Sequence, residues 1–211
     1  MSVQKLDFGQ PLFEIEYVEQ EERYYVPTKS VVINLAERSG KSLRIKGVPL
    51  APLKGTVVQG VWLEDVDRAV VVLDYERYDI DDPEVIAMIK GSWKSLYECS
   101  GIERHKGIPY YKSTKTRVGG DTELNVCFTE AMAPSGPHKD HDRDFDEVHA
   151  QIRGVGKMQI FEENDTSTFY QEFILAPGCV HDKIYDENGE YPWHQYHSVT
   201  RAVYMPIEID R

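Results

Sequence analysis

Short apolar segments separated by turn-forming residues fill the second half of the sequence, and this pattern restricts the fold more than any other feature. The segments are rich in β-branched and aromatic residues, as half-buried strands require. They are Leu124–Phe128, Glu147–Gln151, Lys157–Phe161, Phe169–Leu175 and Ala202–Ile209. Turn-forming pairs lie before and between them, such as Gly119-Gly120, Pro177-Gly178 and Asn188-Gly189. Many short strands joined by tight turns predict an antiparallel sandwich or barrel.

The first half of the sequence mixes predicted strands with one predicted helix. The strands are Ser30–Leu35, Ser42–Ile45, Gly55–Leu63 and Ala69–Leu73. The helix has Asp82 as its N-cap and Pro83 in its first turn, and apolar residues follow at helical spacing up to Tyr97. Gly101 then provides a stop signal. We expect this helix to pack against the sheet as a structural element.

The size and composition of the chain limit how it can be divided. With 211 residues, 41% of them hydrophobic, it can form one core, or a core with a small appended subdomain. We predict a mainly β protein in which residues 106–211 form a β-sandwich. Residues 1–105 are expected to be an N-terminal α/β extension, containing one helix, that packs on this sandwich.

Charge and cysteine content narrow the choice of partners and compartment. The net charge of −12 argues against nucleic acid or anionic membranes as partners, although a local pocket can still oppose the global sign. Cys99, Cys127 and Cys179 form no disulfide pattern, which favours a reducing compartment. No apolar run approaches the roughly 18 residues that cross a bilayer, and no signal-peptide pattern is seen. We expect a cytoplasmic protein that binds a small molecule.

Histidines are crowded into one part of the chain. Six of the seven lie between His138 and His197. They could be solvated loop residues gathered by chance, or they could be metal ligands, because imidazole is the commonest metal ligand in proteins.

One predicted strand favours the metal. Side chains alternate along a strand, so Glu147, His149 and Gln151 share one face. A face of this kind needs a polar interior, and a bound metal would offset the cost of burying the carboxylate. Further along, Pro177-Gly178 makes a turn after an apolar strand and places His181 three residues beyond the glycine.

Together these two segments resemble the cupin superfamily. The first cupin motif runs from histidine through glutamate to glycine, and here it reads HKDHDRDFDEVHAQIRG, from His138 to Gly154. The second places proline and glycine just before a histidine, and here it reads PGCVH, ending at His181. The resemblance covers about residues 110–210 and implies a jelly-roll β-sandwich with His141, Glu147 and His181 as metal ligands. The family pattern usually has a further histidine where this chain has Lys139, which leaves His138 as a candidate fourth ligand.

The resemblance also implies an activity. Two histidines and one carboxylate leave coordination positions open, as in non-heme Fe(II) oxygenases. The spacing of six residues between His141 and Glu147 is similar to that in 3-hydroxyanthranilate 3,4-dioxygenase and homogentisate dioxygenase. We therefore expect an Fe(II) dioxygenase acting on a small aromatic or carboxylate-bearing substrate. Mn(II), Ni(II), Cu(II) and Zn(II) suit the same ligands. A cupin lyase or isomerase, and a ligand-binding cupin without activity, are the alternatives; cupins commonly dimerise.

Several other residues have two interpretations each. His149 could transfer protons or be an ordinary core histidine. Arg153 could hold a substrate carboxylate, although arginine at a strand end is more often solvated. His194 and His197 are expected in a loop before the last strand, where they could cover the pocket or be exposed.

Overall fold

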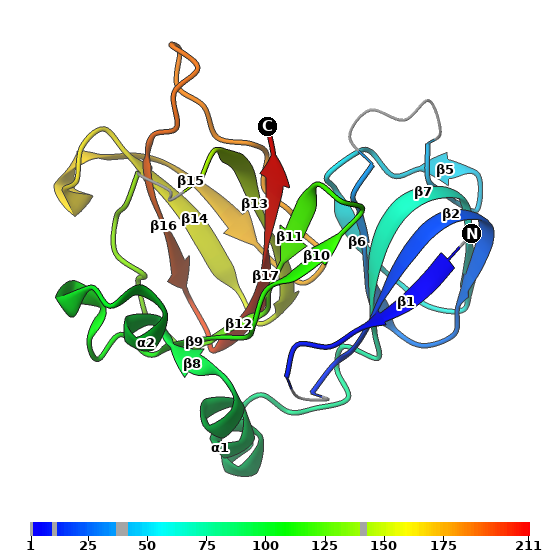
Figure 1. Cartoon of the computed structure of the whole chain (residues 1–211), viewed down its shortest axis with the longest axis horizontal. Coiled ribbons are helices and arrows are strands. Elements are labelled where there is room, and N and C mark those ends of the chain that lie inside the picture. The colour runs from blue at the N-terminus through cyan, green and yellow to red at the C-terminus, as the bar shows by residue number, and fades with distance from the viewer. Residues whose placement is uncertain (1, 10–11, 37–41, 140–142) are drawn as a thin grey trace.

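The computed structural model describes residues 2–9, 12–36, 42–139 and 143–211. Figure 1 shows two β-rich bodies side by side, with two helices along their lower edge. Strands dominate and every strand pair is antiparallel, which confirms the prediction of a mainly β protein.

The first body is a sheet built from the N-terminal strands. It runs in the order β1-β2-β7-β3-β6, and the β4-β5 hairpin pairs with β7. Its strands are β1 (Ser2–Leu6), β2 (Glu14–Val26), β3 (Ser30–Asn34), β4 (Arg44–Ile45), β5 (Val48–Pro49), β6 (Gly55–Val58) and β7 (Val61–Leu73). The pairing of β2 with β7 was not predicted, because the charged residues of β2 mask its alternation. Its buried positions, such as Ile15 and Tyr17, alternate with exposed or half-exposed ones.

The prediction of one continuous helix from Pro83 to Tyr97 is wrong, because the structure has two shorter helices in this segment. α1 covers Pro83–Ser92 with Asp82 as its N-cap, and α2 covers Leu96–Ser100 and ends at Gly101. Trp93 interrupts them with an extended backbone, and its indole N–H donates to the carbonyl oxygen of Phe8. Ser95 and Glu98 then form a capping box that starts α2 independently. Among the described residues, no helix has the length and apolar character needed to cross a membrane.

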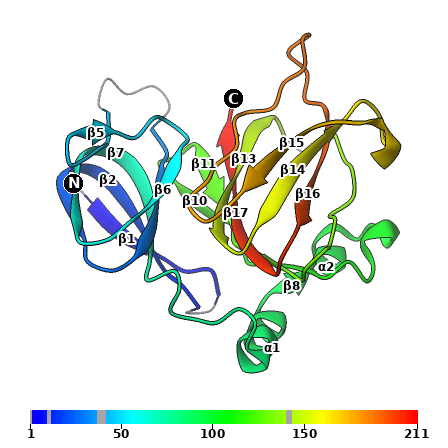
Figure 2. The same cartoon turned by 180° about the vertical axis from the view of Figure 1, so that it is seen from behind.

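The second body is a sandwich of two antiparallel sheets, as predicted. One sheet runs in the order β10-β11-β17-β12-β9-β8, with β13 also paired to β17, and the other runs β15-β14-β16. Figure 2 shows β14, β15 and β16 side by side. The strands are β8 (Lys94–Ser95), β9 (Tyr110–Lys112), β10 (Thr116–Val118), β11 (Thr122–Leu124), β12 (Cys127–Thr129), β13 (Phe145–Arg153), β14 (Gly156–Phe161), β15 (Phe169–Leu175), β16 (Trp193–Ser198) and β17 (Ala202–Asp210). Two 3-10 turns, η1 (Glu103–His105) and η2 (Thr166–Thr168), complete the connections.

The β13–β17 sheet has two chemically different faces. On one face, Val148, Ala150 and Ile207 are buried in a core that also contains residues of the N-terminal strands. On the other face, the residues in between, which include Glu147 and His149, point into the sandwich, because strand side chains alternate. The apolar core therefore supports the sheet from behind, and the polar face is left for chemistry.

We predict that truncating this core destabilises the whole protein. Ile207 is 0% exposed, so Ile207→Ala should lower the free energy of unfolding by about 2–5 kcal/mol. Ile174, on β15, is 70% exposed, so the same change there should alter it by less than about 0.5 kcal/mol. Urea unfolding of both variants measures the difference. Equal losses would contradict a core shared between the two bodies.

Candidate metal centre

Two histidines are fixed next to each other by their own backbones. The N–H of His138 donates to the carbonyl oxygen of His194 at 3.0 Å, and the N–H of His194 donates to that of His138 at 2.9 Å. In an antiparallel pair, two residues that exchange both bonds lie directly opposite and project side chains to the same face. The ring centroids are accordingly 4.3 Å apart. His194 lies on β16 and His138 on the loop before β13.

Backbone carbonyls set the protonation of both rings. Nδ1 of His194 lies 2.9 Å from the carbonyl oxygen of Pro192, and Nδ1 of His138 lies 3.3 Å from that of Gly136. A carbonyl oxygen can only accept, so each Nδ1 carries a proton, and in the neutral form of each ring the lone pair is on Nε2. Metal-ligating histidines are oriented in this way, by donation from the other ring nitrogen to a carbonyl or carboxylate.

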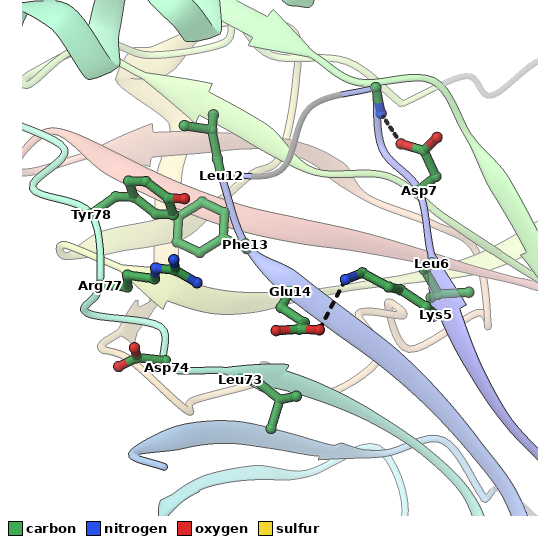
Figure 3. A pocket seen from close by; sticks show the side chains of 11 residues that line it. Lys5, Leu6, Asp7, Leu12, Phe13, Glu14, Leu73, Asp74, Arg77 and Tyr78 are labelled. Atoms are coloured by element: carbon green, nitrogen blue, oxygen red, sulfur yellow. Dashed lines mark hydrogen bonds and ion pairs between the residues drawn. The ribbon is translucent and has the colours of Figure 1, made fainter.

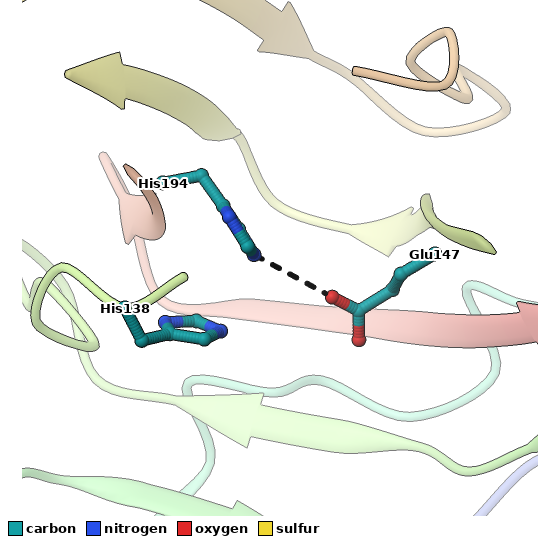
Figure 4. A group of neighbouring side chains, drawn as sticks. All are labelled: His138, Glu147 and His194. Atoms are coloured by element: carbon teal, nitrogen blue, oxygen red, sulfur yellow. Dashed lines mark ion pairs between the residues drawn. The ribbon is translucent and has the colours of Figure 1, made fainter. Parts of the chain in front are cut away.

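Glu147 completes the group from β13. Each of the three residues offers one donor atom, and these atoms all lie within 4.8 Å of one another (Figure 4). Nε2 of His194 is 3.8 Å from a carboxylate oxygen of Glu147. Ligands at bond lengths of about 2.1 Å stand roughly 3–3.5 Å apart around a tetrahedral ion. Two imidazoles and one carboxylate at these separations fit a divalent transition metal after small movements.

The charge around Glu147 is compatible with a bound cation. Glu147 lies directly opposite Glu208 in the β13–β17 ladder, and like charges in such a pair destabilise a sheet. Glu208 is neutralised by Lys115 and Arg143, each 2.7 Å away. The imidazoles of His149 and His194 lie 3.4 and 3.8 Å from the Glu147 carboxylate. A metal ion bound by Glu147 would add positive charge beside this pair of carboxylates.

His149 lies beside this group and lines the same cavity. Its Nε2 is 3.4 Å from the Glu147 carboxylate, and its Nδ1 has no hydrogen-bond partner among the described residues. The rings of Tyr196 and Tyr204 pack around it edge-on. It therefore lies within reach of the Glu147 carboxylate and of a molecule bound in the cavity.

His181 does not join this group in the structure. Its Nδ1 donates to the carbonyl oxygen of Asp182 at 2.7 Å, and its Nε2 accepts the backbone N–H of His149 at 2.9 Å. Both ring nitrogens are thus engaged, and neither offers a lone pair to a metal in this arrangement. Instead, His181 satisfies the backbone of β13 next to the site. His141, the other predicted histidine ligand, lies outside the described residues.

Arg153 also lies away from the group. A β-bulge falls between Gln151 and Arg153, so the alternation that places Glu147 and His149 inward does not extend to it. Its guanidinium packs over the ring of Tyr75, and Nη1 is 3.9 Å from Glu76. In this position it does not hold a carboxylate in the cavity, contrary to the role considered for it.

A cavity of about 590 Å³ opens beside the group. His138, Glu147 and His149 lie in its wall together with aromatic residues such as Tyr110 and Phe145. This volume suits a small organic molecule. A cavity of about 710 Å³ in the N-terminal body, shown in Figure 3, has no histidine or cysteine among its described lining residues, and its Lys5 and Glu14 pair with each other.

His194 was placed in a loop by the sequence interpretation, and this is wrong. It lies in β16 opposite Ile160 of β14 and is 0% exposed. His194, Tyr196 and Ser198 are all buried, and this spacing of two residues could have indicated a strand. The polar residues of the segment and the preceding Pro192 instead favoured a loop. His197, by contrast, points to the other side and contacts Gln159.

Comparisons with known proteins found similar chains among solved structures. No protein-family model and no curated protein matches the chain. Among solved structures, KdgF from Halomonas sp. is 12% identical with a TM-score of 0.39, and the match covers 57% of this chain and 88% of that one. An RmlC-like cupin from Desulfovibrio desulfuricans is 11% identical, with a TM-score of 0.35, and the match covers 48% of this chain and 82% of that one. A cupin 2 barrel protein from Leptotrichia buccalis is 11% identical, with a TM-score of 0.36, and the match covers 99% of this chain and 88% of that one.

Because both ring nitrogens of buried His181 are hydrogen-bonded, we predict that the folded protein loses stability in acid. Burial, followed by the effect of His149, lowers the pKa of His181 to about 3. The unfolded chain therefore binds one more proton than the folded chain between about pH 6.5 and pH 3. Stability falls as the pH falls through this window, by about 1.4 kcal/mol per pH unit.

Urea unfolding of metal-free wild type and His181→Gln measures this effect. The free-energy gap between them should shrink by roughly 3 kcal/mol from about pH 7 to about pH 4.5, because the variant lacks the titrating ring. A gap that does not change with pH would show that His181 protonates freely in the folded protein.

Proposed function

We propose that the chain is a metal-dependent cupin enzyme whose metal is held by His138, Glu147 and His194. The observation that carries this proposal is the convergence of two imidazoles, each with Nδ1 held by a backbone carbonyl oxygen, and one carboxylate beside a cavity. The leading activity is that of a mononuclear non-heme Fe(II) oxygenase acting on a small aromatic or carboxylate-bearing molecule. Three protein ligands leave positions open for a substrate and O₂.

The residues around the ligands support this function in different ways. Fe(II), when bound, would supply the redox chemistry that activates O₂. His149, next to Glu147 and in the cavity wall, can accept or return a proton of the substrate. Burial raises the pKa values of Tyr196 and Tyr204, so these phenols stay neutral and shield the site from water. Tyr191 fixes the backbone of Glu147, because its hydroxyl donates to the Glu147 carbonyl at 2.7 Å.

Metal analysis tests the ligand set. Anaerobically purified wild type should contain close to one metal ion per chain, and Glu147→Gln and His194→Gln should bind that metal at least roughly 100-fold more weakly, because each loses a ligand. His197→Gln is the matched control, since His197 lies on the same strand but contacts Gln159. Elemental analysis and metal titration measure both. Equal metal content in all four proteins would overturn the proposal.

Oxygen consumption separates the oxygenase from the alternative functions. Fe(II)-loaded wild type and His197→Gln should consume O₂ when 3-hydroxyanthranilate or homogentisate is added, and Glu147→Gln should not. Conversion of either compound without O₂ uptake would instead indicate a lyase or isomerase that uses the metal as a Lewis acid. Binding of either compound without any conversion would indicate a ligand-binding cupin.

A further inference from the structure

A lysine lines the same cavity from another strand of the sheet that contains β13. Lys112 ends β9, and it shares the inward face of that strand with Tyr110, two residues before it. Its partner across the ladder is the buried Cys127, and both Lys112 and Glu147 line the cavity. Lysine is rarely placed inside a sandwich unless its charge is used or paired.

Lys112 differs from the other cations that line the cavity. Lys115 pairs with Glu208 at 2.7 Å, and Arg104 donates to the carbonyl oxygen of Pro137 at 3.0 Å. Within the part of the chain that the structure describes, the Lys112 ammonium has neither a hydrogen bond nor an ion pair. It is therefore the cavity cation whose three donors are available to a bound molecule.

Lys112 is charged at neutral pH. Burial pushes its pKa down, but the neighbouring groups, including Cys127, Glu147 and Glu208, outweigh burial and leave the pKa above its usual value. The thiol of Cys127 cannot supply much of this effect, because burial raises its own pKa to about 11. The carboxylates are the real counter-charges, and Glu208 is already paired with Lys115 and Arg143.

Metal binding would change this balance, and here the inference rests on the proposed function. A divalent ion bound to Glu147 would leave a net positive charge at the ligands and a second positive charge on Lys112. Two positive groups would then face a cavity of about 590 Å³. Such a cavity selects an anion, although the chain as a whole carries a net charge of −12.

We propose that Lys112 binds a carboxylate group of the substrate and makes the enzyme specific for small organic acids. The aromatic neighbours Tyr110 and Phe145 would contact the apolar part of such a molecule. The competing explanation is that Lys112 only balances the charge of Glu147. In that case its removal would change stability but would not change the preference for an acid over a neutral compound of the same shape.

Benzoate and benzamide form a matched pair of probes, because they differ in charge but hardly in shape. Their dissociation constants can be measured by ligand-detected NMR with the Zn(II)-loaded protein, which is redox-silent. Wild type should bind benzoate at least about tenfold more tightly than benzamide, as a charge-assisted hydrogen bond allows. Lys112→Met should reduce this ratio to less than about threefold, and Lys112→Arg should restore most of it.

Lys115→Met is the control for general electrostatics. This substitution removes one positive charge from the same cavity. Because that charge is already paired with Glu208, the preference for benzoate should stay within about twofold of wild type. An unchanged preference in Lys112→Met would overturn the proposal, and so would the absence of any preference in wild type. A preference that needs zinc but survives Lys112→Met would assign the carboxylate to the metal and also overturn it.

The metal-free protein separates the two proposals. If wild type binds no zinc, the proposed metal site fails, and the benzoate-to-benzamide ratio of the metal-free protein still tests Lys112 alone. If zinc binds equally to wild type and Lys112→Met but the ratio does not differ between them, the anion site fails and the metal site stands.

Discussion

The half-buried carboxylate of Glu147 is the constraint around which the second half of the protein is arranged. It faces the inside of a sandwich and stands directly opposite another carboxylate, Glu208. Removing two like charges from water is costly unless each is answered by an opposite charge or by hydrogen bonds. Lys115 and Arg143 form ion pairs with Glu208. The imidazoles of His149 and His194 lie near Glu147, and Lys112 interacts with it electrostatically. A cation bound at Glu147, as proposed, would add positive charge beside this pair of carboxylates.

The rest of the fold holds this carboxylate in place. β13 and β17 pack their apolar faces against the core shared with the N-terminal strands, which supports the sheet beneath the site. The pair of backbone hydrogen bonds between His138 and His194 places the two rings next to each other. His181 accepts the backbone N–H of His149, and the Tyr191 hydroxyl donates to the backbone carbonyl of Glu147. Backbone hydrogen bonds therefore join segments of the site that are distant in the sequence.

Part of this arrangement could be predicted from the sequence. The alternation in β13 identified Glu147 and His149 as inward-facing, because a period of two is visible in a single strand. The position of His194 depends on the pairing of β16 with β14 and on its two backbone hydrogen bonds with His138. A local sequence pattern does not indicate such long-range contacts. His181 was proposed because its segment resembles the second cupin motif, whereas its hydrogen bond depends on which backbone N–H group needs an acceptor. The interruption at Trp93 likewise depends on a tertiary hydrogen bond to Phe8.

The proposed ligand set can be tested by anomalous X-ray scattering from crystals loaded with Zn(II) or Co(II), recorded at the absorption edge of the metal. We expect one peak at bonding distance, about 2.0–2.2 Å, from Nε2 of His138, Nε2 of His194 and the Glu147 carboxylate. A peak bonded to His181 without His194, or no peak near Glu147, would contradict it.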